Sequence, residues 1–449
     1  MTDLRPYQIQ GARWLQERHR AMLADDMGLG KSAQLIRAAE GRTLIVAPAM
    51  VIDAGVWADE VARWRPDLDA TIVPYSTIID REKTPKGGSR PLPRVRPEYR
   101  KRWDTILLDE AHYLKGRHTL WTMALDGLVR KSQARTYMAT GTPIPNWAHE
   151  LYMPLRMLKP GDSKPGGPLG SYWRWVERWF EVNETAFSSY AVGNIRDDTP
   201  EGWAAFYRAN LDGIFLRRER DDVLPDLPPL SEQHIDLKME REQRRVYNDL
   251  RRDFLAWLDS GEHVVAWSKA SQFVKLAKSA TGLPSLEPSR ATTGSAKLAY
   301  LREILDSRVR PTLVVAHFRS TVAACARVAR ACGHSVSEVT GTLPRQERAA
   351  AVRSLREGRA SVLVATLDTI SEGLTLTAAD MVVFVEHSWR PSRNEQALRR
   401  IHRLGQDRPV HAVHLWTKAT VDIRMRRVLQ EKTDQQIKAL RPRDLSDLV

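Results

Sequence analysis

The chain has 449 residues, of which 42% are hydrophobic and 28% are charged. These proportions are typical of a globular protein, the length predicts two domains, and no apolar run approaches the ~18 residues that cross a bilayer. The formal net charge of +14 predicts a polyanionic partner, most simply nucleic acid, although a basic surface that meets only solvent explains it equally well.

The first motif is "DDMGLGKS" at 25–32, which matches G-x-x-x-x-G-K-[ST] except that Asp25 replaces the first glycine. Gly28 and Gly30 permit the turn that aims backbone N–H groups at an anion. Lys31 would neutralise the β- and γ-phosphates of a nucleotide, and Ser32 would offer its hydroxyl to Mg²⁺. A helical pattern and the strand-like run "TLIVA" (43–47) follow. By itself the motif leaves open a nucleotide site or a chance glycine cluster.

A basic segment follows at 81–102, "REKTPKGGSRPLPRVRPEYRKR". It holds nine Lys or Arg, four Pro and two Gly. Such a composition does not bury a core. We expect a loop that is either solvated or ordered on phosphate backbones.

An acidic pair ends the next apolar run, "TILLD" (105–109), with Asp109 and Glu110 in "LLDEAH". Carboxylates at the carboxyl edge of a parallel sheet lie where α/β proteins hold their ligands. Asp109 would hold Mg²⁺ and Glu110 would polarise the attacking water. The alternative is a surface acidic pair. Another buried strand is expected at 135–140, "RTYMAT".

The middle of the chain is expected to be helical. "SYWRWVERWF" (171–180) carries an i, i+3, i+4, i+7 stripe that favours core packing over a base-stacking platform; the stripe comprises Tyr172, Trp175, Val176 and Trp179. The proline-rich "LPDLPPL" (224–230) predicts a linker, and a second helical stretch follows at 241–261. We therefore predict domains at 1–228 and 229–449, with helical insertions near 165–215 and 240–290.

The second half repeats the α/β pattern. Strands are expected at 312–318, 361–366, 381–387 and 411–416, which indicates a second parallel sheet. The two cysteines, Cys325 and Cys332, fall on one face of a predicted helix. They are interpreted as buried structural thiols rather than a metal site, which fits a reducing cytoplasm.

A basic motif, "QALRRIHRLGQ" (396–406), lies in this second domain. Arg400 and Arg403 are three residues apart, so on a helix they share a face. A positioned Arg stabilises the charge that spreads over the γ-phosphate during hydrolysis. If they act on the nucleotide held by Lys31, the two domains close around it. The alternative is a solvated basic helix.

In this order the motifs resemble those of the Swi/Snf family of DNA translocases, in helicase superfamily two. The resemblance covers nearly the whole chain. It rests on the opening motif "LRPYQIQGARWL", on motif I "LADDMGLGKS", motif Ia "TLIVAPAMV", motif II "LLDEAHYLKG" and motif III "MATGTPIPN". It also rests on the inter-lobe signature "IFLRRERDDVLPDLPP", on motif IV "VVAHFRS", motif V "ATLDTISEGLTLTAAD" and motif VI "WRPSRNEQALRRIHRLGQ". Motif I of this superfamily lacks the first glycine, so the resemblance makes Asp25 an expected residue.

The resemblance implies two RecA-like lobes with the ATP site in the cleft between them. It implies ATP and Mg²⁺ as cofactors, duplex DNA of low sequence specificity as the partner, movement along DNA without strand separation, and no membrane association. A further protein could supply targeting. The motifs imply five groups of site residues. For ATP they are Arg5, Gln8, Gly28, Gly30, Lys31, Ser32 and Gly373, and for Mg²⁺ Ser32 and Asp109. For catalysis they are Lys31, Asp109, Glu110, Arg400 and Arg403. Thr140, Gly141 and Thr142 are implied for coupling, and Gln396 belongs to motif VI.

Some residues depart from the family pattern. Motif V has Ile370 and Ser371 where many members carry two glycines, and Thr375 where many carry Asn. Its "GLTLT" is more similar to the annealing-helicase branch. The chain stops soon after motif VI, which suggests a minimal motor, cytoplasmic and prokaryotic or phage-encoded.

Three other functions stay open. They are a strand-separating DNA or RNA helicase, the motor part of a restriction or repair nuclease, and a non-catalytic DNA-binding protein. The nuclease alternative depends on a PD…D-x-K pattern at 225–238, with Asp226, Asp236 and Lys238.

Overall fold

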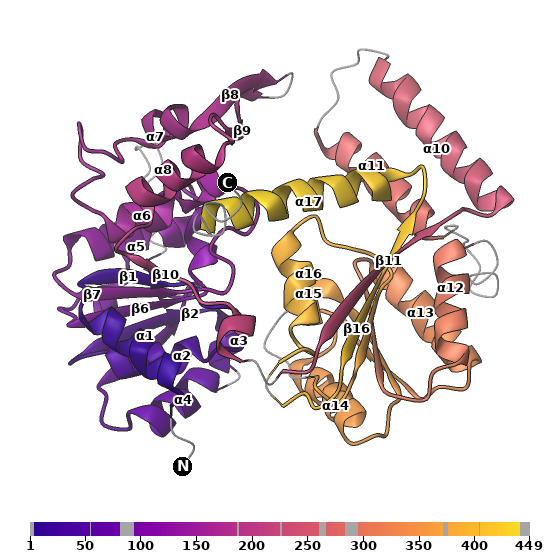
Figure 1. Cartoon of the computed structure of the whole chain (residues 1–449), viewed down its shortest axis with the longest axis horizontal. Helices are drawn as coiled ribbons and strands as arrows, with labels where there is room; N and C mark the ends of the chain where they lie inside the picture. Colours follow the sequence, from indigo (N-terminus) through magenta and orange to yellow (C-terminus); the bar gives the residue numbers. More distant parts are fainter. Residues whose placement is uncertain are drawn as a thin grey trace. The chain divides into compact units, whose positions relative to one another are not determined.

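The structure is a computed structural model that describes residues 4–53, 55–80, 94–185, 188–224, 227–259, 266–282, 295–370, 376–403 and 405–440. The chain forms two compact units (Figure 1). Unit 1 contains Met1–Pro225 together with Lys432–Val449, and unit 2 contains Asp226–Glu431. The division therefore falls after Pro225, near the predicted residue 228. The residues from Lys432 onward belong to unit 1, whereas the sequence analysis places them in the second domain.

Unit 1 is built on a parallel sheet with the order β10-β1-β7-β6-β2-β3. Its strands are β1 (Arg20–Leu23), β2 (Thr43–Ala47), β3 (Ala70–Pro74), β6 (Thr105–Asp109), β7 (Arg135–Ala139) and β10 (Phe215–Leu216). Its main helices are α1 (Pro6–Gln16), α2 (Lys31–Ala38), α3 (Ala49–Asp53), α4 (Val56–Trp64), α5 (Leu120–Lys131), α6 (Tyr152–Leu158), α7 (Tyr172–Trp179), α8 (Pro200–Asn210) and α9 (Arg220–Val223).

Both faces of this sheet are buried. Along β2, Leu44 and Val46 join one hydrophobic cluster, whereas Ile45 and Ala47 join another. Successive side chains of a strand point to opposite faces, so a strand covered on both sides reads as a continuous apolar run. This explains why the runs at 43–47 and 105–109 predict β2 and β6 with the correct ends.

The aromatic stripe at 171–180 lies in the core, as predicted. Trp175 and Val176 of α7 are fully buried, and Tyr172 and Trp179 pack against the same cluster. The Trp175 Nε1 donates to the Asn210 Oδ1 on α8 (2.8 Å). Its one indole N–H is thus satisfied inside the core.

The predicted helical insertion near 165–215 also contains strands. The antiparallel hairpin β8 (Phe180–Thr185) and β9 (Ser188–Ile195) lies between α7 and α8 (Figure 1). Phe180 is the register partner of Ile195, and Val182 that of Val192. Apolar residues at every second position are the sign of a strand, and this alternation was missed. A second short hairpin pairs β4 (Ile79–Asp80) with β5 (Arg94–Val95).

Unit 2 has a second six-stranded parallel sheet, in the order β11-β16-β15-β12-β14-β13. Its strands are β11 (Leu230–Leu237), β12 (Thr312–Ala316), β13 (Val336–Val339), β14 (Val362–Thr366), β15 (Met381–Phe384) and β16 (Val410–Thr417). Its helices are α10 (Arg241–Asp259), α11 (Ala266–Thr281), α12 (Ala296–Asp306), α13 (Arg319–Ala331), α14 (Arg345–Arg356), α15 (Leu367–Ile370), α16 (Pro391–Leu398) and the first part of α17 (Val421–Leu440). The predicted α/β class is confirmed in both units.

Unit 2 contains the residues of two sequence interpretations. Cys325 is fully buried on α13, and Cys332 directly follows that helix and is half-buried. Burial raises the pKa of the Cys332 thiol to about 11, with a further rise from Asp306. In the nuclease pattern, Asp236 lies on the strand β11 and pairs with the Arg426 Nη1 (3.1 Å), and Asp226 lies outside the described residues.

No helix among the described residues combines the length and apolar character of a membrane span.

Candidate nucleotide-binding site

The phosphate-loop motif connects the end of β1 to the start of α2 in unit 1. Gly28 has φ 82° and Gly30 has φ 68°, a left-handed backbone that favours glycine. A Cβ on Gly30 would lie 2.2 Å from the Gln8 Nε2. Because the first N–H groups of α2 have no partner within the helix, this end of the helix is suited to an anion.

Lys31 is held inside the loop. Its Nζ donates to the carbonyl oxygens of Asp25 (2.8 Å) and Asp26 (3.0 Å). Burial lowers the pKa of the Lys31 ammonium, and the nearby carboxylates, Glu110 foremost, oppose this change. Ser32 is the next residue of α2 and is half-buried. The loop thus places a cation and a hydroxyl together at the start of the helix.

The start of α1 packs on the same loop. The Gln8 Nε2 and the Tyr7 hydroxyl both donate to the Leu29 carbonyl, at 3.2 and 3.3 Å. The Arg5 backbone N–H donates to the Gln8 Oε1 (2.9 Å), and the Arg5 side chain is exposed. Gln8 is therefore beside Gly30, as the motif requires. ATP binding by Gln8 and Arg5 stays a prediction.

The acidic pair follows β6, two strands away from β1. The Trp57 Nε1 donates to the Asp109 Oδ2, and the Glu110 N–H donates to the Asp109 Oδ1, both at 2.9 Å. Burial and the neighbouring Glu110 raise the pKa of the Asp109 carboxyl to about 6. A nearby cation would favour its charged form, so its environment fits a Mg²⁺ ligand.

Motif II and motif III are connected through His112. Its Nδ1 lies 3.1 Å from the Glu110 Oε2 and 3.3 Å from the Thr140 Oγ1. Glu110 has φ 48°, a conformation that is uncommon for a residue with a side chain and is found at functional sites. The Thr142 N–H donates to the Thr140 Oγ1 (3.1 Å). His112 thus links the predicted coupling residue Thr140 to the predicted catalytic residue Glu110.

Gly141 packs directly against the phosphate loop. A Cβ at this position would lie 2.6 Å from the Met27 Cγ and 3.3 Å from the Lys31 Nζ. Next to it, the buried Oγ1 of Thr142 has no hydrogen-bond partner within the described chain. An unsatisfied buried hydroxyl beside a lysine and two carboxylates fits a polar ligand such as a nucleotide phosphate.

A cluster of arginines that the sequence analysis did not assign to the site holds the phosphate loop. Asp25 is fully buried, and it accepts from the Arg218 N–H (3.1 Å) and Arg218 Nε (3.0 Å). Arg217 pairs with Asp26 (2.9 Å), and the Arg220 Nη2 donates to the Met27 carbonyl (2.6 Å). Asp25 is therefore a structural anchor. The signal was the run "LRRER", which was read only as part of a motif at the domain junction.

The motif VI residues belong to unit 2. We expected Arg400 and Arg403 to share a helical face, and this was wrong, because α16 ends at Leu398. The Arg400 carbonyl instead accepts from the Leu376 N–H (2.9 Å), so the chain turns there to meet the end of motif V. Gln396 is buried on α16. Gly373 and the unusual motif V residues Ser371 and Thr375 lie outside the described residues.

A second group of metal-ligating residue types lies in unit 2. Glu232, His234 and His414 have ligand atoms within 4.8 Å of one another. However, the Trp416 indole, which can only donate, binds the His234 Nδ1 (3.0 Å), so in neutral His234 the proton is on Nε2 and no lone pair is left for a cation. Burial lowers the pKa of the neighbouring His387 well below its usual value. We interpret the group as a hydrogen-bonded network rather than a metal site.

Comparison with known proteins decides the family. The SNF2-related domain matches residues 7–84 and 91–283, and the helicase conserved C-terminal domain matches residues 296–405. The chain belongs to the SNF2 family. The resemblance stated from the motifs is therefore confirmed, and the phosphate loop and acidic pair lie within the SNF2-related match.

Several curated relatives of this SNF2-family chain are similar along nearly all of it. The mouse "DNA annealing helicase and endonuclease ZRANB3" is 26% identical over 96% of this chain and 40% of its own length. The yeast (Saccharomyces cerevisiae) "ISWI chromatin-remodeling complex ATPase ISW1" is 25% identical over 94% of this chain and 39% of its own length. The Bacillus subtilis "Putative ATP-dependent helicase/translocase YwqA" is 27% identical over 96% of this chain and 48% of its own length. The chain spans less than half the length of these relatives.

A solved structure is also similar. It is described as the Sulfolobus solfataricus SWI2/SNF2 ATPase core in complex with dsDNA, and the match covers 100% of this chain and 97% of that chain. The sequence identity is 20% and the TM-score is 0.41.

Proposed function

We propose that this SNF2-family chain is an ATP-dependent motor that moves along duplex DNA. The observation that carries the proposal is the arrangement at the carboxyl edge of the unit 1 sheet. There Lys31 follows β1, Asp109 and Glu110 end β6, and Thr140 follows β7. These are the parts that ATP hydrolysis requires: a phosphate cradle, a metal ligand and a group that orients water.

The chain's own residues have distinct roles in this proposal. Lys31 leaves the Asp25 and Asp26 carbonyls to bind the phosphates, and the N–H groups at the start of α2 hold the same anion. Ser32 and Asp109 would hold Mg²⁺, which when bound neutralises charge on the phosphate oxygens. Glu110 orients the attacking water and accepts its proton. Because His112 lies between Glu110 and Thr140, it transmits a change at the phosphates to motif III.

Movement requires that hydrolysis changes the grip on DNA. We propose that Arg400 and Arg403 of unit 2 complete the nucleotide site, so that ATP binding and release alternately close and open the two units. Contacts to phosphate backbones bind DNA without reading its sequence, which fits the net charge of +14. A protein partner that directs the motor, and a cytoplasmic location, stay predictions.

The first experiment is steady-state ATP turnover at one stated salt concentration, without nucleic acid and then with duplex DNA, single-stranded DNA or RNA. We expect duplex DNA to stimulate turnover most strongly. Lys31→Ala should abolish it, since the phosphates lose their cation. Lys159→Ala is the matched control, because this lysine of unit 1 donates to the Ala209 carbonyl (3.2 Å), away from the site, and turnover should be unchanged.

The same measurement separates the alternatives. Stimulation mainly by single strands or RNA would favour a strand-separating helicase, which a tailed-duplex unwinding assay would then establish. Undiminished turnover in Lys31→Ala would refute the site assignment. Cleavage of the DNA during incubation with Mg²⁺ would instead favour a nuclease, and absence of any turnover a non-catalytic DNA-binding protein.

A further inference from the structure

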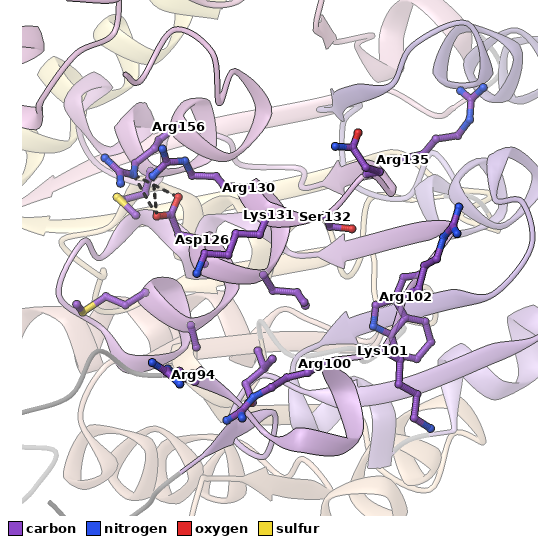
Figure 2. Close-up of a pocket in the computed structure, with 18 of the residues that line it drawn as sticks. Arg94, Arg100, Lys101, Arg102, Asp126, Arg130, Lys131, Ser132, Arg135 and Arg156 are labelled. Atoms are coloured by element: carbon purple, nitrogen blue, oxygen red, sulfur yellow. Dashed lines mark hydrogen bonds and ion pairs between the residues drawn. The ribbon is translucent and has the colours of Figure 1, made fainter. Parts of the chain in front are cut away.

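A large basic hollow lies on unit 1, away from the nucleotide site. Its volume is about 1370 Å³. It lies between the start of β5, the segment before β6, the helix α5 and the segment before β7 (Figure 2). We call it the basic hollow. Its cationic lining consists of Arg94, Arg100, Lys101, Arg102, Arg117, Arg130, Lys131, Arg135 and Arg156.

The hollow and the nucleotide site lie at opposite edges of the same sheet. His19, Glu40, Asp104 and Gln133 line the hollow, and each shortly precedes a strand of this sheet. The phosphate loop and the acidic pair follow strands of the same sheet. Parallel strands of four or five residues hold their two edges about 15 Å apart. A ligand in the hollow therefore does not contact the nucleotide.

The acidic residues of the hollow are already engaged, so they leave its positive charge in place. Asp126 pairs with Arg156 (3.1 Å) and Arg130 (3.6 Å), and Figure 2 shows these three side chains together. Glu40 pairs with Arg135 (3.4 Å). Asp104 accepts from the backbone N–H of Arg42 (2.8 Å).

Four cations of the hollow are available to a ligand. Arg94, Lys101, Arg102 and Lys131 are exposed, and within the described chain no ion pair or side-chain hydrogen bond holds them. Lys131 at the end of α5 is not required for capping, because the Arg20 Nη2 donates to the Val129 (2.9 Å) and Ser132 (3.0 Å) carbonyls there. Unpaired cations in one concave surface favour a polyanion with several charges.

Part of the apolar lining is buried and part is accessible. Val95, Trp103, Ala124 and Tyr152 line the hollow but are each at most 4% exposed, so they form its floor, whereas Met123, Leu128 and Tyr172 are half-buried. The choice of ligand therefore depends on the cations. A phosphate backbone needs spaced cations, and arginine is suited to bind phosphate through two N–H groups.

We propose that the basic hollow is an accessory binding site for the phosphate backbone of duplex DNA, independent of the nucleotide site. The identity of the polyanion, but not the existence of the site, rests on the proposed function. The sequence analysis left the basic segment at 81–102 between a solvated loop and a phosphate-binding one. Residues 81–93 lie outside the described residues, and the described part, 94–102, supplies four of the nine cations. A second contact of this kind would keep the motor on DNA between cycles of hydrolysis.

The test removes the four available cations together, as Arg94→Ala, Lys101→Ala, Arg102→Ala and Lys131→Ala. The control variant removes four exposed cations of unit 1 that do not line the hollow and have no ion pair within the described chain: Arg13, Arg37, Lys164 and Arg208. Both variants lose the same net charge. Binding of a labelled 30-base-pair duplex is measured by fluorescence anisotropy over a series of salt concentrations, and ATP turnover is measured at saturating duplex.

We expect the hollow variant to lower DNA affinity at least about tenfold and to reduce the slope of log K against log salt by about 0.9 per lost phosphate contact, so up to about 3.6. The control variant should change this slope by less than about 0.9, the value for one phosphate contact. Maximal turnover should be unchanged in both. We expect Lys31→Ala to keep its affinity for DNA. The DNA-binding result can therefore be interpreted even if the ATPase proposal fails.

Three results would overturn the proposal. In the first, the hollow variant has the salt slope of the control. In the second, maximal turnover falls with the affinity, which would make the hollow part of the track itself. In the third, the variant keeps its DNA slope but loses binding to a polyglutamate probe, which would assign the hollow to an acidic protein partner.

Discussion

The buried pair of Arg218 and Asp25 should be essential to the phosphate loop. Asp25 is 0% exposed, and Arg218 donates three hydrogen bonds to its carboxylate, at N (3.1 Å), Nε (3.0 Å) and Nη2. In Arg218→Met the carboxylate would stay buried without its partner charge. Such a loss costs about 3–5 kcal/mol. We expect unit 1 to lose this much stability and ATP to bind at least tenfold more weakly.

The assay is urea unfolding together with titration of a fluorescent ATP analogue. Arg42→Met is the control, because its pair with Asp69 is exposed (53% and 70%) and should be worth under about 1 kcal/mol. Adding Asp25→Asn to Arg218→Met removes the uncompensated charge and should restore part of the loss, with a coupling energy of about 1–3 kcal/mol. The reasoning is refuted if Arg218→Met lowers the free energy of unfolding no more than the control does. It is also refuted if the effects of Arg218→Met and Asp25→Asn on this free energy are additive.

Three smaller predictions follow from other contacts. Gly30→Ala should weaken ATP binding at least tenfold, measured with the same analogue, because alanine rarely adopts the left-handed backbone of this residue and its Cβ would displace the Gln8 side chain; unchanged affinity would contradict this. His112→Ala should lower DNA-stimulated turnover at least tenfold with little change in ATP affinity, since it connects Glu110 to Thr140; an unchanged turnover would remove the coupling role. The folded-state pKa of His387 lies well below that of the unfolded chain, so the contribution of His387 to stability is complete above about pH 6.5 and decreases as the pH falls below about 6.5. His387→Phe should make the free energy of unfolding in urea less pH-dependent below about pH 6.5, by up to about 1.4 kcal/mol per pH unit. An unchanged pH dependence would contradict this role of His387.

The strands β2, β6, β7, β12, β14, β15 and β16 were predictable from the sequence because their signals are local, whereas β1, β3, β10, β11 and β13 were not predicted. A strand buried on both faces is a continuous apolar run, as at 43–47 and 105–109, and the acidic pair lies at the end of the second run. The carboxyl edge of a parallel sheet then brings Lys31 and Asp109 together whatever the length of the chain between them.

The remaining features depend on contacts between distant residues or on weak local patterns. The pair of Asp25 with Arg218 joins positions 193 residues apart, and a charged run alone does not indicate which loop it stabilises. The β8–β9 hairpin has only a short alternating pattern. The helix α16 ends at Leu398, and the Arg400 carbonyl accepts a hydrogen bond from Leu376, which is distant in the sequence; nothing near motif VI indicates either feature. The basic hollow is lined by residues from segments that are far apart in the sequence, and only one of these segments, at 81–102, was visible as a charged stretch.

The position of β10 at the edge of the sheet has a consequence for synthesis on the ribosome. β10 pairs with β1, and the arginines that directly follow it hold Asp25 and Asp26. The phosphate loop, although encoded near the start of the chain, therefore lacks its anchors until about residue 220 has left the ribosome exit tunnel. Contacts of such large sequence separation form late in folding. A nascent chain that stops before Phe215 would expose its phosphate loop without binding ATP. The motor would therefore hydrolyse no ATP until unit 1 is complete.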